Sequence, residues 1–109
     1  MADEITFAQF KELDLRSARV LQAERVEGTD KLMRLQIDLG DEQRQIVAGI
    51  AAQYPTDNLV GRDIMVVVNL QPAKIRGVES RGMLLAANIG GEPILAGFDK
   101  EVPPGTPVT

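Results

Sequence analysis

The segment MRLQIDLGDEQRQIVAGI, which runs from Met33 to Ile50, decides the fold class. Its first half alternates between apolar and polar residues, and the apolar members are Met33, Leu35, Ile37 and Leu39. This period of two predicts a half-buried strand over residues 33–39. The run Gly40-Asp41-Glu42 then supplies turn residues, and RQIVAGI predicts a second strand. The centre of the chain is therefore expected to be β-structure.

The segments on either side extend this β pattern. Residues 15–26 mix small and apolar side chains with arginines and alternate poorly. A bent or bulged strand accounts for this, with a helix as the alternative, and the turn residues EGTD follow at 27–30. Residues 62–70, RDIMVVVNL, are apolar on both parities, which predicts a strand covered on both faces and ended by Gln71-Pro72.

The C-terminal part of the chain predicts shorter extended elements. The run GMLLAANI at 82–89 predicts a strand, Gly90-Gly91 a hairpin turn, and PILAGF at 93–98 a short return strand. The final VPPGTPV at 102–108 is expected to be extended, because proline neither donates to a strand ladder nor continues a helix.

Two segments favour helical structure. In ITFAQFKELD, Thr6 is a candidate N-cap, and Phe7, Phe10 and Leu13 fall on one helical face that is expected to be buried. The segment AAQYPTDNLVG at 51–61 contains a proline and small polar residues, which predicts a helical turn or an irregular crossover.

About six short strands with turns every 8–12 residues or so are typical of a small β barrel or sandwich. The most economical fit is an all-β, five-stranded oligonucleotide-binding (OB) barrel with a short N-terminal helix, a helical insertion before strand 4 and a C-terminal β extension. Residues 1–109 are expected to form one domain, with the barrel over about 14–89 and the extension over about 90–109. The extension carries apolar residues that need burial, and packing against a second copy would provide it: Ile94, Leu95, Phe98 and Val102.

The composition excludes most catalytic chemistry. The chain has no cysteine and no histidine, which removes thiolate metal sites, the commonest zinc ligand and the usual general base. Ser80 and Lys74 invite a nucleophile–base pair, but no recognisable motif surrounds them. We therefore expect no catalytic residue, no metal site and no cofactor. We also expect a cytoplasmic protein without membrane association, because no apolar run reaches spanning length and MADEITFAQF lacks the order of a signal peptide.

The charge distribution points to a localised polyanion site. The formal net charge is −4, yet residues 74–81 carry three bases against one acid. In an OB barrel the loops between strands 1 and 2 and between strands 4 and 5 flank the binding face, and these loops are EGTDKLMR and QPAKIRGVES. The candidate phosphate contacts, whose alternative role is ordinary solvated charge, are Arg16, Arg19, Lys31, Arg34, Lys74, Arg76 and Arg81. Neither loop contains an aromatic residue, so we expect phosphates and folded shape to be recognised rather than stacked bases.

Three ordered blocks resemble a known family. They are DLRSARVLQAERVEGTDKL at 14–32, RQIVAGIAAQYPTDNLVGRDIMVVVNLQPAKIRGVESRGMLLAA at 44–87 and DKEVPPGTPV at 99–108. The chain is similar to the tRNA-binding domain found at the C-terminus of methionyl-tRNA synthetases and in stand-alone structure-specific tRNA-binding proteins. The resemblance implies an OB barrel with a C-terminal extension and a homodimer. It also implies binding of tRNA by shape, as an auxiliary to a synthetase catalytic body.

The family's motifs correspond to particular residues of this chain. The D-K-L block matches Asp30-Lys31-Leu32, the K-I-R-G run matches residues 74–77, and S-x-G-M matches Ser80, Gly82 and Met83. The resemblance implies that Ser80 makes a hydrogen bond to tRNA and that Met83 lines the site, with a core position as the alternative for Met83.

This chain departs from the family in two places. It has Gln71 and Ala73 where relatives often carry bases, which thins the basic run, and Ser17-Ala18 where they often have valine and glycine. Some relatives are export-related chaperones, so a homodimeric peptide- or protein-binding function is the alternative.

Overall fold

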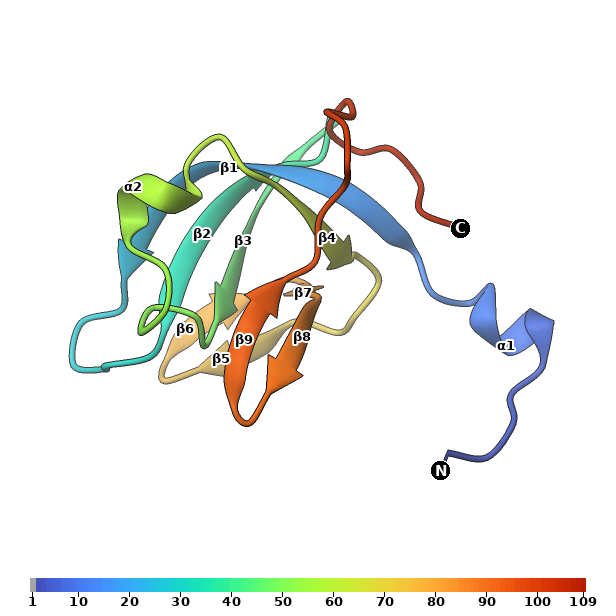
Figure 1. Cartoon of the computed structure of the whole chain (residues 1–109), viewed down its shortest axis with the longest axis horizontal. Helices are drawn as coiled ribbons and strands as arrows, with labels where there is room; N and C mark the ends of the chain where they lie inside the picture. The colour runs from blue at the N-terminus through green and yellow to red at the C-terminus, as the bar shows by residue number, and fades with distance from the viewer. Residues whose placement is uncertain (1) are drawn as a thin grey trace.

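The computed structural model describes residues 2–109 and shows five antiparallel strands that form a nearly closed barrel (Figure 1). The strand order in this sheet is β3-β2-β1-β4-β7. The members are β1 (Leu15–Arg25), β2 (Met33–Asp38), β3 (Gln43–Ala48), β4 (Asp63–Val67) and β7 (Met83–Leu84). Two hairpins, β5 (Ala73–Ile75) with β6 (Val78–Ser80) and β8 (Ala86–Ile89) with β9 (Glu92–Leu95), complete the strands. The prediction of an all-β, OB-like barrel is confirmed.

Strands β2 and β3 form the hairpin whose alternation decides the fold. Leu35 pairs with Ile46 and Met33 with Ala48, and these four side chains are buried in the core. The intervening side chains of β2 point outward and are only half-buried. Strand β2 lies within the predicted segment, because its one-sided burial gives the sequence a period of two, and β3 begins one residue before the predicted segment RQIVAGI.

Strand β1 is long and irregular, which confirms the predicted bulge. Its register against β2 shifts between Val20 and Gln22, so Leu21 is an extra residue on the β1 side. The first part of β1 pairs with β4, and the rest pairs with β2. The bulge bends β1 as it passes from its pairing with β4 to its pairing with β2. It also explains the poor alternation of residues 15–26.

The two short helices differ in how they pack. Helix α2 (Thr56–Leu59) lies between β3 and β4 in the sequence, where a helical insertion was predicted. Its Leu59 side chain is completely buried. Helix α1 (Phe7–Phe10) begins at Thr6, whose side chain accepts a hydrogen bond from the Gln9 amide, as predicted. However, α1 is set apart from the barrel (Figure 1), and Phe7 is 71% exposed. The expected burial of its apolar face within the chain was wrong.

The predicted strand over residues 82–89 is divided between two sheets. Met83 and Leu84 belong to β7 in the barrel, whereas Ala86–Ile89 form β8, which pairs with β9 and is exposed throughout. The Leu85 amide donates to Met65 at 3.0 Å, while its carbonyl accepts from Ala96 at 3.1 Å. The change of partner at Leu85 therefore divides one apolar run into two short strands.

The C-terminal tail returns along β1 of the same chain. The Ser17 amide donates to Thr106 at 2.9 Å, the Gly105 amide donates to Ser17 at 2.8 Å, and the Ser17 hydroxyl donates to Pro103 at 2.8 Å. The predicted extended tail is confirmed. Among its apolar residues and those of the preceding hairpin, Leu95, Phe98 and Val102 are partly buried by their own chain and Ile94 stays 40% exposed. The chain itself therefore covers only part of the extension's apolar surface, and packing against a second copy stays a prediction.

Candidate nucleic-acid interface

The loop between β1 and β2 meets the β5–β6 hairpin at one end of the barrel. Residues Thr29–Leu32 of the loop and Ile75 and Arg76 of the hairpin line an open groove of about 450 Å³. We call this groove the loop groove. As the OB topology predicts, two segments that lie far apart in the sequence come together here, and each supplies a cation.

The β1–β2 loop holds Lys31 on a fixed backbone. The Val26 amide donates to Leu32 at 3.0 Å, and the Thr29 hydroxyl donates to Val26 at 2.8 Å. The Lys31 carbonyl accepts from the Ala51 amide at 2.9 Å, which ties the loop to the segment after β3. The Lys31 side chain is exposed. The Lys31 ammonium group is thus exposed on a loop whose backbone is well anchored.

The β5–β6 hairpin presents Arg76 in an unusual backbone conformation. Its two turn residues, Arg76 and Gly77, have φ values of 55° and 81°, and positive φ at both positions is the requirement of a type I′ turn. Arg76 is the one non-glycine residue with positive φ within residues 2–109. Such a conformation costs a side-chain-bearing residue about 1–2 kcal/mol, which asparagine or glycine would largely avoid. Arg76 is exposed, and within the described chain its guanidinium makes no hydrogen bond or ion pair.

Ser80 secures this hairpin to β3 rather than facing the groove. Its hydroxyl accepts from the Val47 amide at 2.9 Å and donates to the Gly82 carbonyl at 3.0 Å. The residue is 2% exposed. The implied hydrogen bond from Ser80 to tRNA is therefore corrected: the hydroxyl is already engaged inside the fold. The same burial removes Ser80 from any nucleophilic pairing with Lys74.

The other two residues of the S-x-G-M block also serve the barrel. Gly82 has a φ of 128°, and a Cβ there would lie 3.0 Å from the Val67 carbonyl oxygen, so a larger residue would strain this crossing. Met83 is half-buried in β7 opposite Val67 and does not line the loop groove. The block thus shapes the strand that closes the barrel.

Arg16 and Arg19 lie in the first part of β1, away from the loop groove, and are held by acids. Arg16 donates to Asp14 at 3.0 Å, and this hydrogen bond raises the pKa of Arg16 above its ordinary value. Arg19 donates to Asp63 at 3.0 Å, which likewise raises the pKa of Arg19, and it also reaches Glu101 and the Val102 carbonyl. The Arg19 side chain thus connects β1 to β4 and to the C-terminal tail, whereas Arg16 pairs with a near neighbour in the sequence, and the predicted phosphate contacts of both residues stay predictions.

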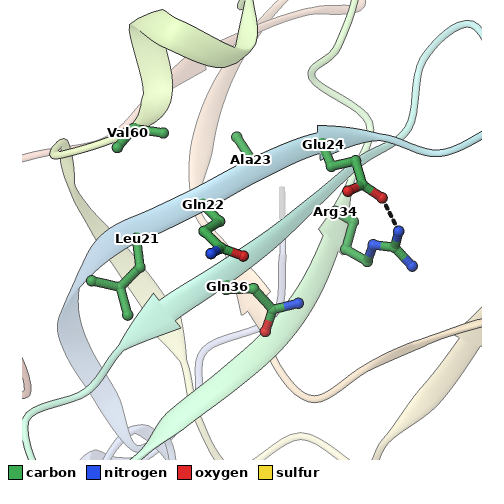
Figure 2. Close-up of a pocket in the computed structure, with 7 residues that line it drawn as sticks. All are labelled: Leu21, Gln22, Ala23, Glu24, Arg34, Gln36 and Val60. Atoms are coloured by element: carbon green, nitrogen blue, oxygen red, sulfur yellow. Dashed lines mark hydrogen bonds and ion pairs between the residues drawn. The ribbon is translucent and has the colours of Figure 1, made fainter.

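The remaining predicted cations are Lys74 on the β5–β6 hairpin, Arg81 directly after it, and Arg34 on the outer face of the barrel. Lys74 and Arg81 are exposed, and the Arg81 amide donates to the Gln45 carbonyl at 2.9 Å. Arg34 forms a cross-strand ion pair with Glu24 on the outside of β1 and β2 (Figure 2). The sequence-based prediction missed Arg25, which is exposed at the end of β1 beside the loop and donates to the Ala51 carbonyl at 3.0 Å. Its position just before the EGTD turn was the available signal.

A second hollow, which we call the strand pocket, lies beside this ion pair. It has a volume of about 320 Å³ and opens outside β1 and β2, with Val60 from the segment after α2 on one side (Figure 2). The two glutamines in this pocket, Gln22 and Gln36, are cross-strand partners, and Gln36 is in turn paired with Gln45 on β3. The three glutamines are opposite one another on adjacent strands, and the sequence-based prediction did not use this signal.

Comparison with known proteins agrees with this geometry. A family described as "Putative tRNA binding domain" matches residues 15–107. The chain belongs to this family. The match confirms the resemblance to the tRNA-binding domains related to methionyl-tRNA synthetase.

Relatives of this tRNA-binding domain include methionine–tRNA ligases. That of Methanothrix thermoacetophila is 62% identical over 101 residues, covering 93% of this chain and 15% of the relative. That of Archaeoglobus fulgidus is 53% identical over 106 residues, covering 97% of this chain and 16% of the relative. The domain therefore spans about one sixth of the length of these relatives.

Solved structures show the same fold across nearly the whole domain. A protein related to methionyl-tRNA synthetase from Pyrococcus horikoshii has a TM-score of 0.93 at 38% identity, with coverage of 99% of this chain and 100% of that one. The chaperone CsaA from Bacillus anthracis has a TM-score of 0.89 at 31% identity, with coverage of 98% and 100%.

The part of the domain that the structure describes has neither a group of side chains suited to a metal ion nor a membrane-spanning helix. Residues 2–109 contain no cluster of three or more carboxylate side chains placed to hold a metal ion. Within the same range, no helix is long and apolar enough to cross a membrane.

Proposed function

We propose that this domain binds tRNA by contacting phosphates with the cations of the loop groove and the β5–β6 hairpin. The observation that carries the proposal is the shared groove of Lys31 and Arg76, neither of which pairs with an acid in the described structure. Lys74 and Arg81 would extend this set on the hairpin and at its base. Phosphate binding needs local positive potential, and these cations supply it on a chain whose net charge is −4.

The pattern of ion pairing supports one docking orientation. Outside the groove, several arginines are held by acids, as in the pairs Arg16–Asp14, Arg19–Asp63 and Arg44–Glu42. The excess of acids over bases, 16 against 12, would disfavour a polyanion on much of the remaining surface. The groove contains no aromatic residue, which favours recognition of backbone and shape over base stacking there.

We further propose that the domain is a non-catalytic, cytoplasmic auxiliary to a methionyl-tRNA synthetase body. The kinship with methionine–tRNA ligases supports this role, since the matched region is about one sixth of each relative. The buried and fully engaged hydroxyl of Ser80 supports the absence of a nucleophile in the groove.

We propose that the domain is a homodimer that pairs through the face carrying α1. Phe7, Phe10 and Leu13 are 71%, 39% and 46% exposed, and together with Leu15 and Val108 they border an apolar groove of about 340 Å³. A second copy would cover this groove. The structural likeness to CsaA, a chaperone, supports a competing occupant, which is a segment of another protein.

Salt dependence of tRNA binding tests the main proposal. If about four phosphates are neutralised, log affinity should fall against log salt with a slope of about −3.6, at about −0.9 per phosphate. Lys31→Ala and Lys74→Ala should each make the slope shallower by about 0.9 without changing the melting temperature. Lys100→Ala is the matched control, because Lys100 is an exposed lysine outside the groove. A flat salt response, or binding of peptide but not of tRNA at low salt, would refute the proposal.

A further inference from the structure

The strand pocket is chemically different from the loop groove, because its charges cancel. Arg34 is paired with Glu24 across the strands, so the wall they form is neutral (Figure 2). The other polar members are the uncharged amides of Gln22 and Gln36. Phosphate binding needs net positive potential, and this pocket does not provide it. It suits an uncharged, polar, planar group instead.

The amides of the pocket are partly pre-arranged. The Gln45 amide donates to the Glu79 carbonyl at 2.8 Å, and the Gln36 amide donates to the Gln45 side-chain oxygen at 2.9 Å. This chain of bonds runs from the β5–β6 hairpin to the centre of β2 and fixes the Gln36 amide. The Gln36 side-chain oxygen accepts no hydrogen bond within residues 2–109, and the Gln22 side chain makes none there. Donors and an acceptor are therefore left for a ligand.

Apolar side chains complete the pocket on the side away from the ion pair. Val60 is 51% exposed, and Leu21, the bulge residue of β1, lies on the pocket wall with it. An exposed valine beside the two glutamine side chains offers one apolar surface and one hydrogen-bonding edge. This is the combination that holds a nucleobase, whose face is apolar and whose edge carries donors and acceptors.

We propose that the strand pocket accepts one unstacked nucleobase of the bound RNA, with Gln22 and Gln36 on its edge and Val60 and Leu21 against its face. A volume of about 320 Å³ lies within the range of roughly 300–1,000 Å³ typical of small-ligand sites. The inference rests on the proposed tRNA binding. The strand pocket would add a contact to a nucleobase, whereas the loop groove would contact only phosphates.

The position of the pocket fits an RNA strand that leaves the loop groove. Gln36 lies five residues along from Lys31, a distance of about 16 Å if the chain is extended. Arg34 lies between them on the outward face of β2. A few nucleotides of single strand, such as those of a tRNA loop, would span this distance while their phosphates stay near the hairpin.

The test compares glutamine variants with cation variants in tRNA binding. Gln22→Ala and the double variant with Gln36→Ala should weaken tRNA binding by about fivefold or more, as expected when hydrogen bonds to a base edge are removed. Because no charge is removed, the salt slope should equal that of the unmodified protein. Gln53→Ala, which removes an exposed glutamine outside the pocket, should bind tRNA normally. Melting curves check that all three variants fold, and Gln22→Ala is the safest because its amide has no partner to lose.

Dimethyl sulfate probing of the bound tRNA gives a second measurement. The protein should protect one loop adenine or cytosine, and the Gln22→Ala, Gln36→Ala double variant should lose that protection while phosphate contacts persist. If the double variant matches the unmodified protein in affinity and protection while Lys31→Ala still weakens binding, the base pocket is refuted and the tRNA function stands. If the unmodified protein does not bind tRNA, the proposed function fails and the base pocket fails with it.

Discussion

Replacing Arg76 by asparagine should make the protein more stable and a weaker ligand for tRNA. The strain is visible in the backbone, where Arg76 has a φ of 55° at the tip of the β5–β6 hairpin. A side-chain-bearing residue in this region costs about 1–2 kcal/mol, and asparagine tolerates the region better than arginine. We expect Arg76→Asn to recover about 0.5–1 kcal/mol of unfolding free energy. For a domain of this size, that corresponds to a melting temperature higher by about 2–6 °C.

The same substitution should reduce tRNA binding through charge alone. Arg76 lines the loop groove and has no ionic partner within residues 2–109, so its replacement should remove about one phosphate contact. The slope of log affinity against log salt should become shallower by about 0.9. Arg76→Lys is the matched control: it keeps the charge and most of the slope, and it also keeps the strained backbone and therefore the original melting temperature.

Two measurements decide the matter. Thermal unfolding followed by circular dichroism gives the stability change, and filter binding of tRNA at several salt concentrations gives the slope. If Arg76→Asn leaves the melting temperature unchanged or lower, the turn is not strained as argued. If the slope is unchanged, Arg76 does not contact phosphate, and the hairpin owes its conformation to something other than binding.

Three further substitutions test the fold and the assembly. Ser80→Ala should lower the unfolding free energy by about 1–3 kcal/mol in urea titration, because it leaves a buried amide unpaired, with the tRNA salt slope preserved; an unchanged free energy would contradict the structural role. Gly105→Ala should destabilise by more than about 1 kcal/mol, since its φ is 81° and a Cβ would clash with the Leu39 carbonyl; unchanged proteolysis of the tail would contradict this. Phe7→Ser with Phe10→Ser should convert a dimer to a monomer in sedimentation and lower the melting temperature only as far as association had stabilised the fold, whereas an unaltered dimer would place the interface elsewhere.

The strands that could be predicted are those whose side chains are buried on one face of the sheet or in a continuous apolar run. In β2 each residue's parity reports which side of the sheet it faces, so alternation locates this strand without knowledge of its partners, whereas β3 was located by its apolar run, whose last three residues are all buried. The apolar run of β4 likewise reports a strand whose inward residues are buried, although the observed strand ends at Val67, before the run does. The bulge in β1 appeared as a broken period, because the extra Leu21 shifts the parity of the rest of the strand.

The elements that could not be predicted depend on contacts distant in sequence. The run of residues 82–89 contains no local signal at Leu85, where the chain exchanges the barrel for the β8–β9 hairpin. The β5–β6 hairpin was hidden for a different reason: its turn carries Arg76 where the usual type I′ signal is asparagine followed by glycine.

The candidate site shows the same division between local and distant causes. The meeting of Lys31 with Arg76 followed from topology, because an OB barrel places the two loops together. Arg16 and Arg19 were predicted as phosphate contacts from charge alone, without regard to the acids that pair with them. Asp63 and Glu101, which hold Arg19, lie 44 and 82 residues away in the sequence, so the pairing is invisible until the chain folds.

The small number of unpaired cations bears on how the proposed module would work. Four cations around the groove and hairpin would supply only a few phosphate contacts, and phosphate binding through so few contacts is weak at physiological salt. Weakness is no disadvantage for a module attached to a catalytic body. Once the body holds one part of the tRNA, the module meets another part at a high effective concentration, so modest affinity becomes strong combined binding. A grip made of few phosphate contacts also lets the product tRNA leave quickly, because few interactions have to break before it dissociates. In this proposal the acidic remainder of the surface would disfavour the tRNA orientations that the few cations could not exclude by attraction alone.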